Sequence, residues 1–269
     1  MTDSLSNWLA LRESADAAAR SVTLTRALAG VLPRHTPLRI VDLGSGRGSN
    51  VRYLTGYLPS PQQWLLVDQD AALLAEVPAA MSATQRQECD IETRRMNLGT
   101  LVPEIFSGRD LVTASALLDL VSEDWLGSLA AHCSATGAVV LFALTYNGQS
   151  RCSPAEPEDD AIRELMNRHQ WTSDKGFGPA AGPDAVDCAA RCFAGVGYQV
   201  RREASDWVLP ADARELQRQL MQGWADAATE IAPEESAWIG DWLARRLAHV
   251  ASGHSIVTVG HEDLAAWPD

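Results

Sequence analysis

Residues 40–48 constrain the fold of this chain more than any other stretch. An apolar run ends in Asp42, and three glycines follow at alternate positions, Gly44, Gly46 and Gly48. Glycine lets the backbone turn tightly and approach a bound molecule closely, because it has no Cβ. A helix-compatible segment comes next, and its first amides would point at that molecule. The pattern predicts a strand, a loop and a helix that together hold a small cofactor.

The spacing of the glycines indicates which cofactor this is. The dinucleotide fingerprint G-x-G-x-x-G places a pyrophosphate at the loop. Here the glycines alternate, and the acid Asp42 stands two residues before the first of them, where it disfavours a pyrophosphate but attracts an ammonium or sulfonium group. This pattern resembles motif I of the class I S-adenosylmethionine (SAM)-dependent methyltransferases. The resemblance implies cofactor contacts for Asp42, Gly44, Ser45, Gly46 and Gly48.

The chain up to residue 146 alternates between strand and helix patterns. Strands are expected at 38–43, 64–67, 85–89, 110–115 and 138–144, and helices at 7–32, 50–58, 71–76 and 124–133. Strands that alternate with helices imply a parallel sheet covered on both faces. Ligands in such sheets bind at the carboxyl ends of the strands.

The regular alternation of strand and helix patterns ends after residue 146. Residues 147–184 are rich in Pro, Gly and Asp; further helices are expected at 159–168, 185–194, 212–228 and 234–252, and strands at 198–208 and 254–260. This order resembles the methyltransferase layout, which implies a single domain over 1–269 with a Rossmann-like, doubly wound, seven-stranded sheet and an antiparallel last strand. The expected parts are a core (22–146, 185–208 and 254–261), insertions (147–184 and 209–253) and N-terminal helices (5–32).

An acid stands at the end of each of the first three expected strands: Asp42, Asp68 and Asp90. A carboxylate such as that of Asp68 can accept from both ribose hydroxyls. The resemblance implies that Gln69 flanks the adenine and that Asp90 accepts from its amino group. It also implies cofactor contacts for Ile91, over the adenine, and for Ser115, at the methyl donor.

The N-terminal helix carries Arg12, Asp16 and Arg20 at a spacing of four, so they share one face. Two interpretations stay open. The face is either an exposed charge ladder or a lid over the cofactor, with Arg20 meeting the SAM carboxylate.

The acceptor side is less well specified. Methyl transfer needs an aligned nucleophile and exclusion of water, and it needs a base only if the nucleophile is protonated. Candidate residues follow the fourth and fifth strands or lie in the insertion: Asp119, Tyr146 and His169. Our hypothesis is that Asp119 or His169 acts as base or orients the acceptor. Residues 174–178, polar and aromatic between glycines, are typical of a substrate lid or of a plain surface loop.

Two further features leave alternatives open. Trp207, Trp224, Trp238 and Trp242 either pack amphipathic helices or line an apolar or cationic acceptor pocket. Lys175 is the only lysine in the chain, by chance or because it does something that arginine cannot.

Composition sets the remaining expectations. A net charge of −13 argues against a nucleic-acid partner, and no apolar run is long enough to span a bilayer. The polar N-terminus does not have the layout of a signal peptide. Five cysteines without a CxxC pair predict a reducing, cytoplasmic location and no metal site.

The sequence thus predicts a SAM-dependent methyltransferase that moves the methyl group to a small-molecule acceptor by in-line displacement. One alternative is a non-catalytic or non-methylating SAM-fold protein, and a weaker one is a nicotinamide-dependent oxidoreductase. Neither the acceptor nor the oligomeric state follows from the sequence.

Overall fold

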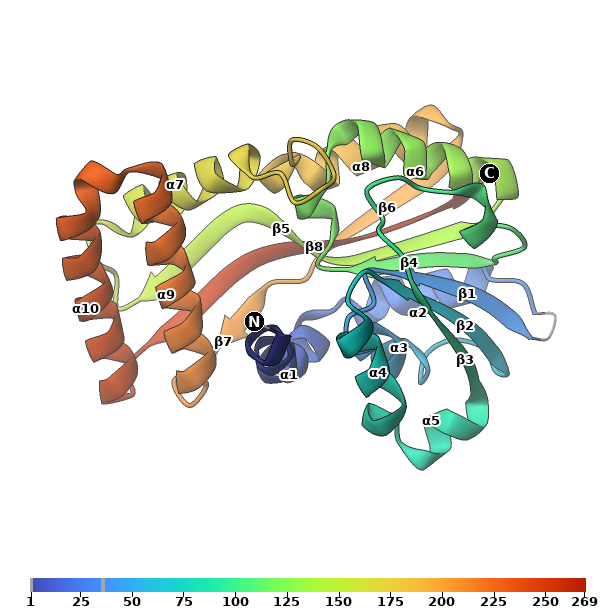
Figure 1. Ribbon diagram of the computed structural model, residues 1–269, viewed down its shortest axis with the longest axis horizontal. Coiled ribbons are helices and arrows are strands. Elements are labelled where there is room, and N and C mark those ends of the chain that lie inside the picture. The colour runs from blue at the N-terminus through green and yellow to red at the C-terminus, as the bar shows by residue number, and fades with distance from the viewer. Residues whose placement is uncertain (1, 35–36) are drawn as a thin grey trace.

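The computed structural model describes residues 2–34 and 37–269. Within these residues it contains one eight-stranded sheet of order β3-β2-β1-β4-β5-β8-β6, with β7 paired to β8 (Figure 1). The strands are β1 (Leu38–Leu43), β2 (Gln62–Asp68), β3 (Cys89–Arg95), β4 (Leu111–Ser115), β5 (Val139–Ser153), β6 (Tyr198–Ala204), β7 (Trp207–Leu209) and β8 (Ile256–Pro268). The strands from β3 to β5 run parallel, and β8 runs antiparallel between β5 and β6. The predicted doubly wound sheet with an antiparallel last strand is confirmed.

Helices cover both faces of this sheet because alternate strand residues point to opposite sides. In β1, Ile40 packs with one apolar cluster and Val41 with the other. The α-helices are α1 (Thr2–Ala19), α2 (Val22–Val31), α3 (Ser49–Leu54), α4 (Ala71–Ala80), α5 (Ala83–Glu88), α6 (Glu123–Thr136), α7 (Asp159–Thr172), α8 (Ala185–Gly195), α9 (Arg214–Ile231) and α10 (Ser236–Ser252). No helix in the described part of the chain is long and apolar enough to cross a membrane.

The strand count differs from the seven expected, because the strand predicted at 198–208 breaks in two. Its interruption lies at Ser205 and Asp206. The Ser205 amide donates to the carbonyl of His261 (2.9 Å), and the Asp206 carboxylate accepts from the His261 amide (3.0 Å). These two contacts turn the chain, so that β7 pairs with an earlier part of β8 than β6 does.

The prediction of a strand at 85–89 is wrong. Those residues fall mainly in α5, which begins with a capping box in which Ser82 and Gln85 bond each other's backbone amides. The third strand is β3, which starts at Cys89. Asp90 and Ile91 therefore lie at the beginning of this strand and not at its carboxyl end.

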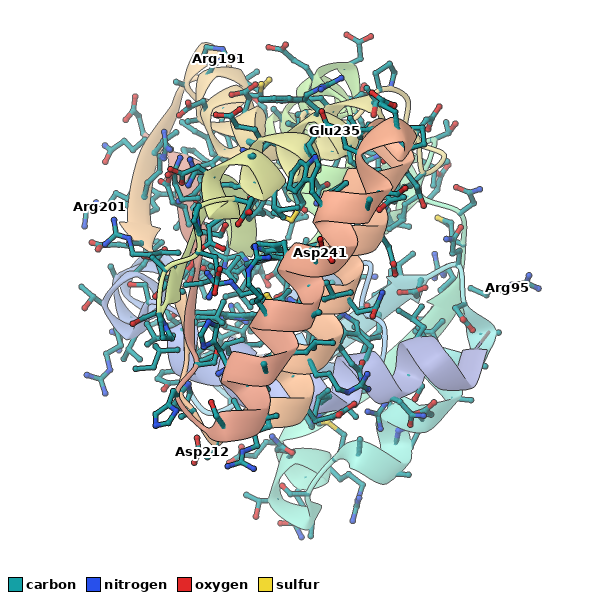
Figure 2. All side chains as sticks on the ribbon, turned by 90° about the vertical axis from the view of Figure 1, so that its left-hand side faces the viewer. Arg95, Arg191, Arg201, Asp212, Glu235 and Asp241 are labelled. Atoms are coloured by element: carbon teal, nitrogen blue, oxygen red, sulfur yellow. The ribbon has the colours of Figure 1, made fainter. Side chains whose placement is uncertain are left out.

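The last part of the fold is a long antiparallel ribbon that carries its own helices. β5 continues to Ser153, beyond the predicted end at residue 144, and pairs with β8 across two register shifts. Helices α7, α9 and α10 pack on this ribbon around a third apolar cluster, at the left of Figure 1. Trp207, Trp224 and Trp242 are buried in this cluster, and Asp241 lies on the outer face of α10 (Figure 2). The ribbon extends past the carboxyl end of β4, so this helical half stands beside the edge where ligands bind.

Candidate functional site

The glycine loop follows β1 as predicted. Gly44, Gly46 and Gly48 all have positive φ (68°, 51° and 76°), a region that residues with a Cβ rarely occupy. The amide of Gly44 donates to the carbonyl of Val67 at the end of β2 (2.8 Å), which ties the loop to the neighbouring strand. Gly48 has a packing role, because a Cβ there would lie 3.1 Å from a methyl carbon of Val77 on α4.

A cavity of about 420 Å³ lies at the carboxyl ends of β1, β2, β3 and β4, within the range of small-molecule sites. Six of the residues predicted to bind the cofactor line it: Gly44, Ser45, Gly46, Asp68, Gln69 and Ser115. Helix α1 closes the other side with Leu5, Leu9 and Arg12. These residues, predicted from the sequence to contact the cofactor, therefore line one wall of a single cavity.

Asp68 joins two parts of that wall. One carboxylate oxygen accepts from the Gly46 amide (2.8 Å), and the other accepts from the Asp70 amide (2.9 Å). Each oxygen has a second lone pair. Asp68 can thus hold the glycine loop and still accept from ligand hydroxyl groups.

Asp42 does not line the cavity. It lies buried behind the glycine loop, where one of its oxygens accepts from the Asn50 amide (2.6 Å). Its other oxygen has no partner among the described residues. Burial raises the pKa of this carboxyl to about 7, although the hydrogen bond from Asn50 and the charge of Arg20 oppose the shift.

Arg20 is buried at the junction of α1 and α2. One terminal nitrogen donates to Asn50 (2.5 Å), and the guanidinium carbon lies 4.2 Å from the ring centre of Tyr53. Its Nε and second terminal nitrogen are buried without a partner in the described chain. Arg20 lines a cavity of about 180 Å³ that shares Asp16 and Ser115 with the larger one. A buried arginine with two unpartnered donors among the described residues therefore lies next to the main cavity.

The α1 face is not an exposed charge ladder. Arg12 and Asp16 form an ion pair at 2.9 Å, and each side chain is 14% exposed. Asp16 also accepts from the indole of Trp207 on β7 (3.0 Å). Helix α1 thus covers the cavity with its charged face inward.

Backbone strain also concentrates here. Among the described residues, only two that are not glycine have positive φ: Ala116 (51°) and Leu144 (56°). Ala116 lines the larger cavity and Leu144 the smaller one. Strain of this kind persists where the surrounding structure holds it, often at functional sites.

The acceptor-side candidates are only partly brought together. Asp119 is buried, with one oxygen unpartnered among the described residues, between the cavity-lining residues Leu117 and Leu120. Burial raises its pKa to about 6, against opposing effects that include Arg12 and Lys175. Tyr146 donates its hydroxyl to Asn167 on α7 (2.9 Å) and lies against His261, a residue that the sequence did not single out.

His169 lies elsewhere. It is on α7 and pairs with Glu230 of α9 at 3.0 Å, so the structure does not bring it to the cavity. Asp90 and Ile91 are also outside, because they start β3 at the opposite end of the strands, where Asp90 lines a different hollow. The place expected for them is taken by Met96 and Leu98, which follow β3 and line the cavity.

The 174–178 segment does reach the cavity. Lys175 and Phe177 line it, and Phe177 packs edge-on against Trp125 (5.8 Å between ring centres). The Asp174 carboxylate accepts from three successive amides, of which that of Gly176 is the closest (2.8 Å), and so fixes the turn. The single lysine of the chain is therefore at the site.

Comparisons with known proteins give the fold a wider setting. No protein-family model and no curated protein sequence matches this chain. Solved structures do match it. A mycolic acid cyclopropane synthase complexed with SAH and CTAB is 11% identical, with a TM-score of 0.50 over 91% of this chain and 83% of that one. The YcgJ protein from Bacillus subtilis is 12% identical, with a TM-score of 0.50 over 91% and 99% of the two chains.

A SAM-dependent methyltransferase from Thiobacillus denitrificans in complex with S-adenosyl-L-homocysteine is 13% identical, with a TM-score of 0.45 over 93% of each chain. At these identities the likeness concerns the fold. This chain has the Rossmann-like fold found in class I SAM-dependent methyltransferases.

Proposed function

We propose that this protein is a SAM-dependent methyltransferase that acts on a small-molecule acceptor. The observation that carries the proposal is the cavity at the carboxyl ends of the strands, which joins a glycine loop and a strand-end acid. A smaller cavity beside it is lined by Arg20, a buried arginine with two donors unpartnered among the described residues. The fold supports the same conclusion. A glycine loop alone would be weak support, because many nucleotide-binding proteins have one.

The residues present fit each part of SAM. Asp68 would accept from the ribose hydroxyls, and Met96 and Leu98 would pack on the adenine. The open nitrogens of Arg20 would donate to the carboxylate of the methionine part, and Asp16 would attract its ammonium group. When bound, SAM supplies a methyl group already activated on a sulfonium. The protein has to align an acceptor and keep water away.

Asp119 is our candidate for handling a proton of the acceptor. It is buried beside the residues that follow β4, and a carboxyl with a pKa of about 6 is largely ionised at neutral pH. Such a group can take a proton or hold a donor in place. If it acts as a base, kcat/KM should fall below about pH 6 as Asp119 becomes protonated. The Asp119→Asn variant should lose that acidic limb and about 10²–10⁴-fold in kcat, with SAM affinity unchanged.

The first test is isothermal titration of the protein with SAM, S-adenosylhomocysteine and NADH. Binding of both adenosyl compounds without binding of NADH supports the proposal. Asp68→Ala should abolish most of that binding, whereas Asp90→Ala, at the far end of β3, should leave it unchanged. Binding of NADH alone, or of none of the three, would contradict the assignment.

A further inference from the structure

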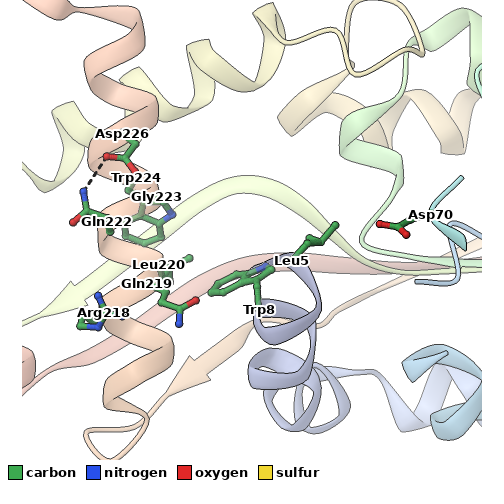
Figure 3. Close-up of a pocket in the computed structure, with 10 residues that line it drawn as sticks. All are labelled: Leu5, Trp8, Asp70, Arg218, Gln219, Leu220, Gln222, Gly223, Trp224 and Asp226. Atoms are coloured by element: carbon green, nitrogen blue, oxygen red, sulfur yellow. Dashed lines mark hydrogen bonds between the residues drawn. The ribbon is translucent and has the colours of Figure 1, made fainter. Parts of the chain in front are cut away.

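A second cavity, of about 780 Å³, lies between α1 and α9. Leu5 and Asp70 border both this cavity and the one assigned to the cofactor. A molecule in one would therefore lie next to a molecule in the other. We call the second cavity the α1–α9 groove, and its main lining residues are Leu5 and Trp8 of α1, Leu220, Trp224 and Asp226 of α9, and Asp70 (Figure 3).

The walls of the α1–α9 groove are largely apolar. Trp8 extends from α1 toward α9 (Figure 3), and Trp224 of α9, which is 7% exposed, also lines the groove; no ring contact joins them in the described part of the chain. Leu5 is 46% exposed at the mouth of the groove. Apolar surface left open beside a proposed active site is typical of a ligand pocket.

The charge of the groove is negative. Two carboxylates line it, Asp226 and Asp70, the second of which also caps α4 by accepting from the Ala72 amide (2.8 Å). Arg218 is the only cation among the described residues that line it. Arg218 is already engaged by Glu215 of α9 through two hydrogen bonds of 2.6 and 2.9 Å. Asp226 accepts from Gln222 with one oxygen and is otherwise exposed toward the groove. The charges therefore favour a cationic occupant, in keeping with a net charge of −13 for the whole chain.

We propose that the α1–α9 groove binds the body of the methyl acceptor, and that this acceptor is an apolar or aromatic compound with a cationic ammonium group. Indole faces attract cations in addition to packing on apolar groups. Carboxylates next to them select a cation over an anion of the same shape. The role as acceptor site rests on the proposed function; the binding of the cation does not.

Three probes that share a phenyl ring and differ in charge test the proposal in the full chain. They are 3-phenylpropylamine, 3-phenylpropanol and 4-phenylbutyrate, titrated calorimetrically at low ionic strength. The amine should bind about tenfold more tightly than the carboxylate, with the alcohol between them. Trp8→Leu should weaken amine binding about fivefold. Asp226→Asn, an exposed change of the same shape, should weaken it about threefold.

Two matched variants lie away from the groove. Asp241→Asn removes the same charge from the outer face of α10 (Figure 2), and Trp171→Leu removes an exposed indole from α7. Both should bind the amine like the unchanged protein. Equal affinity for amine and carboxylate, no detectable amine binding at millimolar concentration, or equal affinities of Asp226→Asn and Asp241→Asn would overturn the proposal. SAM titration of the same samples separates the two proposals, since amine binding without SAM binding would refute only the methyltransferase assignment.

Discussion

Arg246 in the helical half and Arg20 beside the cofactor cavity are both buried, but their donors are satisfied very differently. Arg246 is 0% exposed, and its Nε and one terminal nitrogen donate to Asp159 of α7 while the other donates to the carbonyl of Pro154 (2.5 Å). Arg20 is 5% exposed, and only one of its nitrogens has a partner, Asn50, among the described residues.

This difference distinguishes an arginine that stabilises the fold from one that can bind a ligand. A buried guanidinium loses its hydration, and the loss must be compensated by hydrogen bonds. The chain itself supplies them for Arg246, which joins α10 to α7. For Arg20 two donors have no partner among the described residues, and the residue lines a cavity, so an anionic ligand group there would complete the site. A buried charge whose donors the chain does not satisfy is thus a candidate for binding a ligand, whereas a fully paired one such as Arg246 is structural.

The largest effect on stability should come from breaking the ion pair between Arg246 and Asp159. Asp159→Asn leaves Arg246 buried without its counter-charge and weakens the acceptor of the Trp242 indole (2.8 Å). We expect a loss of about 3–5 kcal/mol in the free energy of unfolding, measured by urea denaturation. The neighbouring Asp160→Asn is the control, because Asp160 is 78% exposed and, within the described residues, pairs only with Arg163. Equal stability of the two variants would mean that Arg246 finds other partners.

Buried strands could be predicted from the sequence, whereas an edge strand could not. The strand that ends in Asp68 was predictable because Trp64–Val67 is a buried apolar run. β3 was not, because it lies at the edge of the sheet, with charged residues through most of its length and mixed burial. Because the third strand was expected at 85–89, Asp90 was placed at its carboxyl end and assigned to the adenine, whereas it lies at the start of β3. The Ser82 and Gln85 capping box was the available signal that a helix occupied this stretch.

The acceptor side shows a second limit. Lys175 reaches the cavity because the 174–181 segment packs on the start of α6, and Ala181 donates to Val121 (2.7 Å). His169 has the same kind of sequence context, yet α7 turns it toward α9. Such placements depend on tertiary packing between distant segments, which the local sequence pattern does not determine.

A smaller change in the free energy of unfolding should appear when the pH changes the protonation state of Asp42. Its pKa in the folded protein is about 7, against 3.8 for an ordinary aspartate. Between these values the folded state holds more protons than the unfolded state, so the free energy of unfolding falls as the pH rises. Asp42 should account for about 2–3 kcal/mol of loss between pH 5 and pH 8.

Asp42→Asn removes this titration and keeps an oxygen that can accept from Asn50. Urea unfolding at several pH values should show a flatter pH dependence for this variant than for the unchanged protein. Asp241→Asn should keep the full dependence. A steeper decline in Asp42→Asn would show that the carboxylate of Asp42 stabilises the fold.

Arg20→Met should affect binding more than folding. Methionine keeps an apolar stem against Tyr53 and removes the charge, so the unfolding midpoint should change little. If the open donors hold the SAM carboxylate, SAM affinity should fall about 10- to 100-fold, as measured by calorimetric titration. Arg26→Met, an exposed change on α2, is the control. Unchanged affinity in Arg20→Met would place the SAM carboxylate elsewhere.

The smallest effect should come from the outer edge of α1. Glu76 of α4 accepts from the Ser6 hydroxyl (2.8 Å) and from Arg47 of the glycine loop (2.5 Å), and these contacts lie at the surface. Contacts of this kind are weak, in contrast to the buried pair between α7 and α10. Weakening them should loosen the end of α1 near Ser6, while Glu13 still pairs with Arg52 (2.6 Å) and Asp16 with Trp207 (3.0 Å). Glu76→Gln should speed SAM dissociation about two- to fivefold in stopped-flow measurements, and Glu164→Gln on α7 should not. A slowing of dissociation, or a change above tenfold, would mean that Glu76 acts on the ligand directly and not through α1.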